Sequence, residues 1–475
     1  MTSTDPRAAA TDPDRSGLRL VGAETVVPLV TGGERRYVNL DYAASAPALA
    51  CVASAVSQLL EWYSSVHRGA GFKSRAATAA YEGARESIRA FVGARDDDAV
   101  IITRNTTDSI NLLATALPED VRVIGFAGEH HANLLPWQRR GGSLILPVPT
   151  SPGELLERLE EALRTAGSTP TLVTVTGASN VTGEVMPLTD IASLTHRYGA
   201  RLLVDAAQLA PHHAIDMAAT GIDYLALSGH KLYAPFGAGA LIGRGDWLGG
   251  TPFLAGGGAV KLVTVGETLW ADLPDRQEAG SPNVVGAVAM GVACDTLAAY
   301  GMDRVEADEL DLWGYARSVF AAVPGWEHYR LWGPDHPRVG LFTFNLRPWS
   351  HDQLAAILSA EHGIGVRHGC FCAHPLMMEL LHVEQGEADR LMEDTRAGGH
   401  PHLPGAARIS FGVATTRTDV DAAAAALRAI ATDGPAWTYA VDPLTGEFEP
   451  DPDPRPMPSL PFAMAAHHVR SGEST

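Results

Sequence analysis

Cysteine is scarce in this sequence, and basic residues are outnumbered by acidic ones. The 475 residues include 4 cysteines, 36 lysines and arginines, and 55 aspartates and glutamates, which gives a formal net charge of −19. So few cysteines exclude a disulfide scaffold and favour a reducing compartment, and we therefore expect a cytoplasmic protein. A strongly acidic surface repels other polyanions, so neither nucleic acids nor anionic membranes are expected partners.

Long apolar runs are also missing. No uncharged apolar stretch reaches 18 residues, which argues against a membrane-spanning helix. The first 20 residues, Met1 to Leu20, contain aspartate and arginine and lack an apolar segment, so no secretory signal is expected there. The hydrophobic content of 46% is still sufficient for a large core, which we expect to be divided between two subdomains.

Short apolar runs alternate with helical stretches in the first half of the chain, which predicts an α/β fold. The candidate strands are Ala99–Thr103, Val121–Ala127, Ser143–Pro147, Thr171–Thr176, Arg201–Asp205, Tyr224–Ser228 and Ala238–Gly243. This alternation favours a mostly parallel sheet that is covered on both faces and binds ligands beyond the carboxyl ends of its strands. A helix predicted over Ala287–Tyr300, continuing past Arg304, leads out of this region.

The chain divides into five predicted regions. We expect a disordered N-terminus over residues 1–25, and a large domain over residues 26–290 whose first segment contributes to the small domain. A small C-terminal domain follows over residues 291–433, interrupted by a polar insertion at 379–404, a long loop or a short helix plus loop. Residues 434–475 are rich in proline and are predicted to form an extended tail that wraps a partner subunit or stays disordered.

Lys231 is the most informative single residue. It ends the segment Ser228-Gly229-His230-Lys231, which follows an apolar strand and precedes a glycine-rich run. A lysine amine attacks an aldehyde only when it is neutral, which requires desolvation or nearby positive charge. Ser228 and His230 can donate hydrogen bonds to a phosphate, so the segment suits pyridoxal 5'-phosphate (PLP), which carries both groups. Taken alone, it fits a surface lysine after a strand equally well.

Two further segments at predicted strand ends suit the same cofactor. Thr106 and Thr107 open a helix, where backbone N–H groups and hydroxyls can hold a phosphate. The competing interpretation is an ordinary helix cap. His130 follows the next strand, and its imidazole can stack on a pyridine ring and act as an acid or base, although a histidine pair is also common in polar loops.

Two more strand ends carry polar residues. Asp205 ends a buried strand, where a carboxylate is costly unless a cation such as a protonated pyridine nitrogen pairs with it. An N-cap of the next helix is the rival interpretation of Asp205. The amide of Asn180 can donate to the 3′ oxygen of the cofactor ring, although Ser179-Asn180 alone would indicate only a turn.

These segments together resemble the class V aminotransferase superfamily of PLP enzymes, and within it the cysteine desulfurase and selenocysteine lyase group. They occur in family order over roughly residues 35–430. The matching segments are Asp41-Tyr42-Ala43-Ala44, Val66-His67-Arg68-Gly69, Asn105-Thr106-Thr107-Asp108, Glu129-His130-His131-Ala132-Asn133, Ser179-Asn180, Asp205-Ala206-Ala207-Gln208, Ser228-Gly229-His230-Lys231, Gly256-Gly257-Gly258, Glu278-Ala279-Gly280-Ser281-Pro282-Asn283, Arg367 to Cys372, and Arg408.

The resemblance implies a type I PLP-dependent transferase fold, with a mostly parallel seven-stranded sheet in the large domain and a smaller α+β domain. It also implies a homodimer with active sites at the subunit interface. Lys231 would hold PLP covalently and shuttle the α-proton of the substrate, and His130 would stack on the ring. Asp205 would pair with the pyridine nitrogen, and Gln208 would contact the phenolic oxygen.

The resemblance assigns the remaining site residues to the phosphate and the substrate. The phosphate would be held by Thr106, Thr107, Ser228, His230 and, reaching in from the second subunit, Ser281. The substrate would be bound by Asn180 and Arg408 at its carboxylate, with His67 and Arg367 also contributing.

Cys372 selects the reaction. It lies five residues after Arg367 and is followed by Ala373-His374-Pro375-Leu376-Met377, the setting of the nucleophilic cysteine in desulfurases of this group. The resemblance therefore implies conversion of L-cysteine to L-alanine, with a persulfide formed on Cys372 and passed to an acceptor, for which a protein is one candidate. The thiolate is the nucleophilic form of cysteine.

Other interpretations of Cys370 and Cys372 stay open. The pair is also compatible with inert buried thiols, or with a redox pair in which Cys370 resolves an oxidised or persulfidated Cys372. A metal site with His368 and His374 is not expected, because four ligands within seven residues rarely reach one tetrahedral ion. We therefore predict no metal.

The substrate is less constrained than the cofactor, because some positions depart from the family pattern. Ser281 stands where threonine is usual, and Gly177 stands where a histidine often precedes Ser179-Asn180. The alternative function is a PLP-dependent C–S lyase or aminotransferase acting on another amino acid in a specialised pathway. A non-catalytic scaffold with the same fold is a further alternative, which Lys231 and Asp205 argue against.

Overall fold

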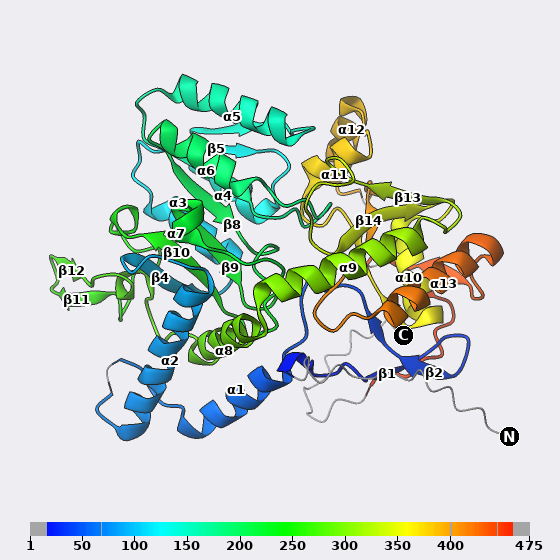
Figure 1. The fold of residues 1–475 in the computed structure, drawn as a ribbon, viewed down its shortest axis with the longest axis horizontal. Helices are drawn as coiled ribbons and strands as arrows, with labels where there is room; N and C mark the ends of the chain where they lie inside the picture. Colours follow the sequence, from blue (N-terminus) through cyan, green and yellow to red (C-terminus); the bar gives the residue numbers. More distant parts are fainter. Residues whose placement is uncertain (1–16, 68, 400, 444, 459–475) are drawn as a thin grey trace, which may run out of the picture.

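The computed structural model describes residues 17–458 except residues 68, 400 and 444. A large domain and a small domain lie side by side, and the long helix α9 (Met302–Phe320) runs along the small one (Figure 1). Residues 1–16, within the predicted disordered N-terminus, and residues 459–475, within the predicted tail, lie outside the described residues.

The large domain is built on a seven-stranded sheet with the strand order β4-β10-β9-β8-β7-β5-β6. Only β10 runs antiparallel to its neighbours, so the prediction of a mostly parallel seven-stranded sheet is confirmed. The seven strands are β4 (Asp98–Thr103), β5 (Arg122–Phe126), β6 (Ser143–Leu146), β7 (Thr171–Thr176), β8 (Arg201–Asp205), β9 (Tyr224–Ser228) and β10 (Gly239–Arg244).

Both faces of this sheet are covered, because successive side chains of each strand point to opposite faces and both sets are apolar. In β8, Leu203 packs in the cluster beneath α3 (Thr106–Ala116) and α4 (Leu135–Arg140). Leu202 and Val204 pack in the larger cluster on the other face. The helices contributing to that larger cluster are α1 (Ala50–Trp62), α2 (Phe72–Phe91), α5 (Pro152–Ala166), α6 (Leu188–Arg197), α7 (Met217–Thr220), α8 (Val284–Tyr300) and the start of α9.

The long helix predicted to run from Ala287 past Arg304 is broken. Helices α8 and α9 meet at Gly301 with a bend of 75°. The φ of Gly301 is +98°, a backbone conformation that residues other than glycine rarely adopt. Gly301 therefore ends one helix and redirects the chain into the next. Among the described residues no single helix is long and apolar enough to cross a membrane, and α8 and α9 reach that length and composition only as a bent pair.

The small domain contains a four-stranded antiparallel sheet with the order β13-β14-β17-β16. The sequence predicts strands near Val339–Asn345, Ile364–Arg367 and Ala407–Phe411 and a helix over Ala422–Ala431, where the structure has β14, β15 with the start of β16, β17 and α13; β13 and α10 were not predicted. Its elements are β13 (Trp326–Tyr329), β14 (Leu341–Leu346), α10 (His351–His362), β15 (Ile364–Gly365), β16 (Arg367–Gly369), β17 (Ala406–Ser410) and α13 (Arg417–Asp433). The N-terminal segment joins this domain, because β3 (Val38–Asn39) pairs with β15.

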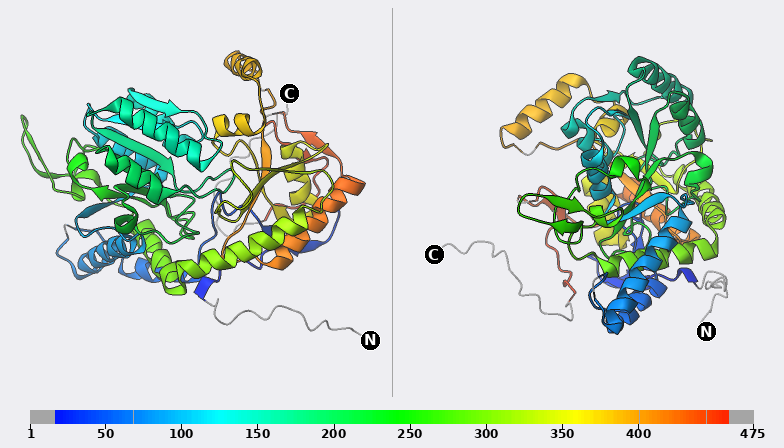
Figure 2. Two further views of the ribbon diagram at one scale, coloured as in Figure 1. Left: turned by 45° about the horizontal axis from the view of Figure 1, so that its top comes forward. Right: turned by 90° about the vertical axis from the view of Figure 1, so that its left-hand side faces the viewer.

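Two segments extend from these cores. The first is the hairpin of β11 (Val260–Val263) and β12 (Thr268–Trp270), which projects from the large domain. The second is α12 (Gln385–Arg396), which follows α11 (His374–Leu380) in the predicted insertion and stands away from the body of the small domain (Figure 2). No residue of α12 is buried.

The ends of the described chain are packed rather than extended. Leu18 and Leu20 are buried in the large core, although both lie within the segment 1–25 that was predicted to be disordered. In the predicted tail, β18 (Tyr439–Val441) pairs with β19 (Phe448–Pro450). Glu361 of α10 accepts hydrogen bonds from the backbone N–H groups at 436 and 437 and from the Tyr439 hydroxyl. This part of the tail therefore docks on its own small domain. The remaining short strands are β1 (Val26–Pro28) and β2 (Glu34–Arg36).

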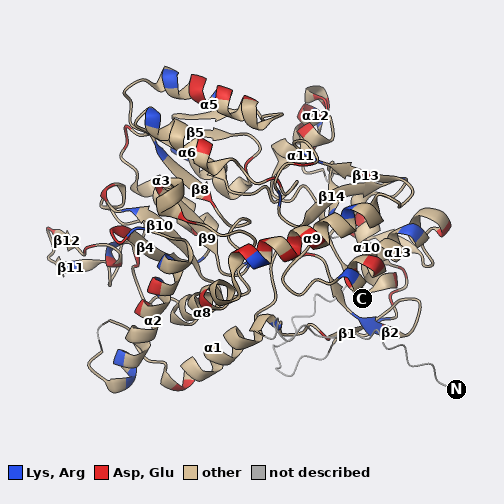
Figure 3. Cartoon of the chain, viewed as in Figure 1, with Lys and Arg blue, Asp and Glu red and all other residues tan. Residues whose placement is uncertain are grey.

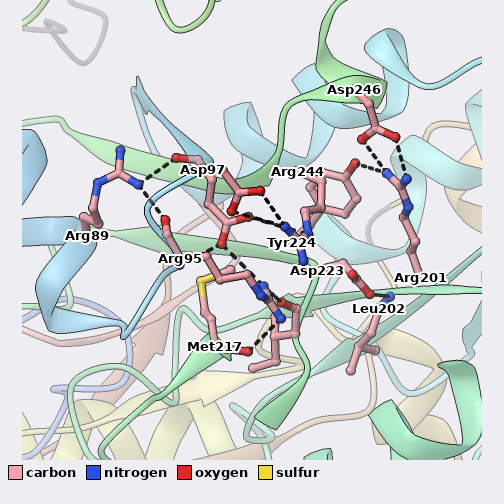
Figure 4. Close-up of polar contacts among 12 residues, drawn as sticks. Arg89, Arg95, Asp97, Arg201, Leu202, Met217, Asp223, Tyr224, Arg244 and Asp246 are labelled. Atoms are coloured by element: carbon pink, nitrogen blue, oxygen red, sulfur yellow. Dashed lines mark hydrogen bonds and ion pairs between the residues drawn. The ribbon is translucent and has the colours of Figure 1, made fainter. Parts of the chain in front are cut away.

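Charged side chains gather on the outer helices, such as α5 and α9, and at the amino ends of the parallel strands (Figure 3). Arg201, at the start of β8, binds Asp246 and donates to the Tyr224 hydroxyl at 3.0 Å, and Arg244 pairs with Asp97 (Figure 4). These ion pairs all lie at the amino ends of the parallel strands. The carboxyl ends, where α/β sheets bind ligands, lie on the opposite side of the sheet.

A buried ion pair ties α2 to the segment that follows the β11–β12 hairpin. The side chains of Arg85 and Glu278 are each 4% exposed, and Arg85 Nη1 lies 2.7 Å from Glu278 Oε1. The same carboxylate accepts hydrogen bonds from the Tyr81 hydroxyl and the Ile102 backbone N–H. These contacts raise the pKa of Arg85, although burial opposes them.

We expect Arg85→Ala to lower the free energy of unfolding by about 3–5 kcal/mol, because it leaves a buried carboxylate without its cation. Urea titration followed by circular dichroism measures this loss. Arg164→Ala is the matched control, since Arg164 is 66% exposed and its pair with Glu161 lies in water. A surface pair contributes about 1 kcal/mol or less, so equal losses in the two variants would contradict the expectation.

Candidate active site

A cavity of about 240 Å³ lies at the carboxyl ends of the parallel strands, where the sequence predicts a site. It collects residues from five strand ends of the large domain and from β16, β17 and the loop after β16. The predicted site residues that line it are Thr106, Thr107, His130, Asn180, Asp205, Gln208, Ser228, His230, Lys231, Arg367, Cys372 and Arg408.

Lys231 follows β9 and lies beside the buried end of β8. Its Nζ lies 3.3 Å from Oε1 of Gln208, to which it donates. Burial lowers the pKa of Lys231 to about 8, and the positive charge of Arg408 adds to this effect. A substantial fraction of the amine is therefore neutral near pH 8, the form that reacts with a carbonyl carbon.

Asp205 is a buried carboxylate at the end of β8, with 4% of its surface exposed. Oδ1 accepts the backbone N–H of Ala207 at 2.9 Å. Burial raises the pKa of Asp205, and the charge of Lys231 opposes this shift only in part. A cation placed against Asp205 would stabilise its ionised form.

The start of α3 meets the end of β9 at one side of the cavity. The backbone N–H and the hydroxyl of Thr106 each lie 2.8 Å from the hydroxyl oxygen of Ser228. Asn105 caps the helix by accepting the backbone N–H of Asp108 at 3.0 Å. The exposed Thr107 belongs to the same first turn. Hydroxyls at a helix N-terminus are suited to an anion such as a phosphate.

His130 lies over the cavity from the loop after β5. Its Nδ1 accepts the backbone N–H of Ala132 at 3.0 Å, so the ring proton resides on Nε2. Burial lowers the pKa of His130 to about 4, and the charge of Lys231 contributes in the same direction. The imidazole is therefore neutral at pH 7.

Arg408 of β17 connects the small domain to the cavity. Nη1 donates to the backbone oxygen of Asn180 at 2.7 Å, and Nη2 donates to Asp41 at 3.3 Å. Its guanidinium lies 4.8 Å from the centre of the Phe371 ring. The Nε of this buried residue has no hydrogen-bond partner, which is a cost unless a ligand supplies an acceptor. Asp41 lies in a segment that the sequence singled out without giving it a role.

The loop after β16 holds Cys372 in an unusual backbone conformation. Phe371 and Cys372 have φ values of +54° and +55°, and Ala373 N–H donates to Cys370 O at 3.0 Å. Two central residues with positive φ are the pattern of a type I′ turn, which costs about 1–2 kcal/mol for each residue other than glycine.

Neighbouring backbone contacts offset this strain. Asn180 Nδ2 donates to Phe371 O at 2.8 Å, and His131 N–H donates to Cys372 O at 2.7 Å. The turn leaves Cys372 exposed at the cavity, whereas Cys370 Sγ lies 3.5 Å from His374 Nδ1. The two cysteines therefore have different surroundings despite their spacing.

His67 and Ser281 do not line this cavity. Both are exposed and line a separate pocket of about 430 Å³ together with the segment from Gly257 to Gly258. His67 Nε2 lies 2.8 Å from Glu82 Oε1. The predicted site residues thus fall into two groups within one chain.

Sequence reasoning missed the residues that support Gln208. Its Nε2 lies 3.1 Å from His212 Nε2, and His212 Nδ1 lies 2.6 Å from Glu309 Oε2 on α9. Glu129, which was noted only as part of a motif, accepts the backbone N–H of Thr176 at 3.0 Å, and burial raises its pKa to about 8. The His212 to Glu309 contact joins positions 97 residues apart, so no local pattern could indicate it.

The site can be compared with known proteins. A model of the family described as aminotransferase class V matches residues 38–423. The chain belongs to the class V aminotransferase family. This confirms the resemblance seen in the sequence, and enzymes of this family depend on PLP.

Within the family, the chain is similar to cysteine desulfurases. It is 35% identical to a probable cysteine desulfurase of Halalkalibacterium halodurans, over 82% of this chain and 92% of the relative. It is 40% identical to a cysteine desulfurase of Dickeya dadantii, over 71% of this chain and 83% of the relative. The structure of the cysteine desulfurase CsdA from Escherichia coli aligns with a TM-score of 0.69 at 31% identity, covering 82% of this chain and 94% of that one.

The lowered pKa of Lys231 in this class V protein predicts selective reactivity. Because its amine loses its proton near pH 8, reductive methylation of the cofactor-free protein by formaldehyde should modify Lys231 with a midpoint near that pH. Peptide mass spectrometry across pH 6 to 11 measures the profile. The exposed lysines Lys73 and Lys261 give the reference in the same digest. A Lys231 profile that coincided with theirs would contradict the argument.

Proposed function

We propose that this class V enzyme is a cysteine desulfurase that converts L-cysteine to L-alanine and carries the released sulfur as a persulfide on Cys372. The observation that carries the proposal is the position of Cys372. A strained turn places the exposed Cys372 in the lining of the same cavity as Lys231 and the buried Asp205. The similarity to cysteine desulfurases supports the same conclusion.

The residues of the cavity fit PLP. Lys231 offers a partly neutral amine, and Asp205 is a buried carboxylate that a protonated ring nitrogen would pair with. The hydroxyls of Thr106, Thr107 and Ser228, with His230, would hold the phosphate at the start of α3. When bound, PLP supplies an electron sink that stabilises negative charge at the α-carbon of the substrate.

His130 and Gln208 would position the ring from either side. The fixed tautomer of His130 presents its Nε2 proton and a neutral ring face, which is suited to stacking. Gln208 is held by His212 and Glu309, so its amide keeps one orientation toward the phenolic oxygen. Lys231 Nζ would accept the proton of the substrate α-carbon and hold it for return to the product.

Arg408 would bind the carboxylate of the substrate, together with Asn180. The unpartnered Nε of Arg408 gives that carboxylate a buried donor. Because Arg408 and Asn180 also contact the Phe371 segment, substrate binding and the position of the cysteine loop are linked. Arg367 is exposed at the cavity and would add positive charge near the same group.

The sulfur transfer balances without an external oxidant. The Cys372 thiolate attacks Sγ of the substrate, an S–S bond forms, and the Cβ–Sγ bond breaks with its electron pair left on the substrate carbon. Protonation of that carbon gives alanine. The net reaction is L-cysteine plus the Cys372 thiol yielding L-alanine and the Cys372 persulfide, whose outer sulfur an acceptor thiol then removes.

His67 and Ser281 would complete the site of a second subunit. In one chain they lie in a separate pocket, although the family pattern gives them roles beside the phosphate and the substrate. A homodimer in which this pocket faces the cavity of the partner reconciles the two arrangements. The hydroxyl of Ser281 would then reach the phosphate from across the interface.

We expect Cys372→Ala to abolish alanine formation from L-cysteine under a thiol reductant, with a loss of at least about 100-fold in kcat, because no nucleophile remains for the sulfur. Amino-acid analysis and sulfide release measure the reaction. Absorbance of bound PLP should be retained, since Cys372 is not among the residues proposed to hold the cofactor. Cys370→Ala is the matched control and should keep most of the activity.

Product identity separates this function from its rivals. Full alanine formation by Cys372→Ala would refute the persulfide step. Formation of pyruvate and ammonia, or exchange with an α-keto acid, would instead support a C–S lyase or an aminotransferase.

The dimer proposal predicts complementation between two inactive variants. Lys231→Ala lacks the amine, and a His67→Ala, Ser281→Ala double variant lacks the residues offered to the partner. Random pairing after co-expression should restore about a quarter of the wild-type activity, because half of the dimers then contain one intact site. If all of these residues served their own chain, the mixed preparation would stay as inactive as the separate variants.

A further inference from the structure

A second cluster of polar side chains lies in the small domain, among residues to which the proposed function gives no role. His351 and Asp352 begin α10, and His402 lies just before β17, at the end of the insertion. One potential ligand atom from each of the three lies within 4.8 Å of the other two. Asp352 and His402 are 50 residues apart, so no short motif marks this cluster, and the prediction of no metal was argued only from the residues around Cys370 and Cys372.

The hydrogen bonds of His351 leave one of its ring nitrogens without a partner. Its Nε2 lies 3.3 Å from the backbone oxygen of Leu403, which can only accept, so Nε2 carries the proton. Nδ1 then presents a lone pair, and this buried atom has no hydrogen-bond partner. A carbonyl that fixes the tautomer of a histidine in this way is a common feature of metal ligands.

The other two side chains are placed at the spacing of ligands. His402 Nε2 lies 3.2 Å from Asp352 Oδ2, while Asp352 Oδ1 accepts the Gln353 backbone N–H at 2.9 Å. Two atoms at about 2 Å from a tetrahedral ion lie about 3.3 Å apart, so small shifts would admit an ion between them. The side chain of Asp352 is 9% exposed and that of His402 is 58% exposed, which leaves the cluster accessible from solvent.

The donor set identifies the class of ion. Two imidazole nitrogens and one carboxylate oxygen favour Zn²⁺ or a similar first-row divalent ion over Mg²⁺ or Ca²⁺, which prefer oxygen ligands. With three protein ligands, water would occupy a fourth position. The ring of His368 stacks on that of His351, with centroids 5.6 Å apart. His368 is also paired with Glu447 of the tail, so both contacts help to hold the ring of His351 in place.

Among the described residues of the insertion, those of the projecting helix gain no support from burial. Helix α12 buries no residue and stands away from the body of the molecule (Figure 2). Burial of apolar side chains therefore contributes little to the placement of this segment. At its return, Gly405 packs against His351 and against Gly369 of β16, close to where the insertion rejoins the sheet.

We propose that His351, Asp352 and His402 bind a divalent transition-metal ion, with Zn²⁺ as the preferred ion, and that the bound ion clamps the end of the 379–404 insertion onto α10. This site is separate from the cavity around Lys231. Its function is structural, since it holds the returning segment of the insertion against the small domain.

Titration of the metal-free full-length holoenzyme with ZnCl₂ in a calorimeter tests the proposal. We expect saturable binding of one ion, and at least about a tenfold weaker affinity in His402→Gln and in Asp352→Asn. Bound Zn²⁺ should also slow proteolytic cleavage within residues 385–404. Substitution with Co²⁺ should give visible absorption bands of a site with nitrogen ligands, which disappear in His402→Gln.

Two controls locate the ion. His382→Asn changes an exposed histidine at the other end of the insertion and should bind like the wild type. Cys372→Ala should also bind normally, which separates this site from zinc held by the reactive thiol. The proposal is overturned if no saturable binding occurs, if His402→Gln binds with unchanged affinity, or if binding is lost only in Cys372→Ala. Retained PLP absorbance in each variant reports that the fold is intact.

Discussion

The candidate active site depends on the burial of two ionisable groups side by side, the amine of Lys231 and the carboxylate of Asp205. Lys231 and Asp205 lie at the ends of adjacent strands, and burial shifts the pKa of each toward its neutral form. Removing two such groups from solvent is costly, so the surrounding fold must supply the stability that the pair does not. The sheet supplies it, because both of its faces are covered by apolar side chains and the strand ends are held rigidly.

Hydrogen bonds to backbone carbonyl groups connect the two domains at the cavity that this pair lines. Asn180 and His131 belong to the large domain, and they donate to the carbonyl groups of Phe371 and Cys372 in the loop of the small domain. Arg408 spans the same junction. A thiol reacts efficiently when it is held in a fixed orientation toward the atom that it attacks. The turn fixes the orientation of Cys372, and the hydrogen bonds to its carbonyl groups offset the strain of the turn. The junction between the domains is therefore also the place where the proposed chemistry occurs.

The sequence was sufficient wherever one local pattern decided the outcome. The seven strands were predicted because each is a short apolar run bounded by polar residues, and the strand-end residues were predicted together because parallel strands bring their carboxyl ends to one edge. The break at Gly301 was missed, because helical periodicity continues on both sides of a single glycine. The support of Gln208 by Glu309 and the pairing of Arg408 with Asp41 were missed because they join remote segments, whose contacts only the tertiary fold determines.

Both ends of the segment that contains the insertion lie beside the candidate active site. An ion bound at His402 would therefore affect the cavity. Gly369 pairs with Ala406, so the chain from residue 370 to 405 leaves and re-enters the sheet at adjacent positions. Cys372 lies just after the departure and Arg408 just after the return. Disorder at the return would be transmitted to β17 and to the guanidinium it carries, whereas a bound ion would confine motion to the projecting α12. In the proposed enzyme, α12 would then move while the residues proposed to position the substrate stay fixed.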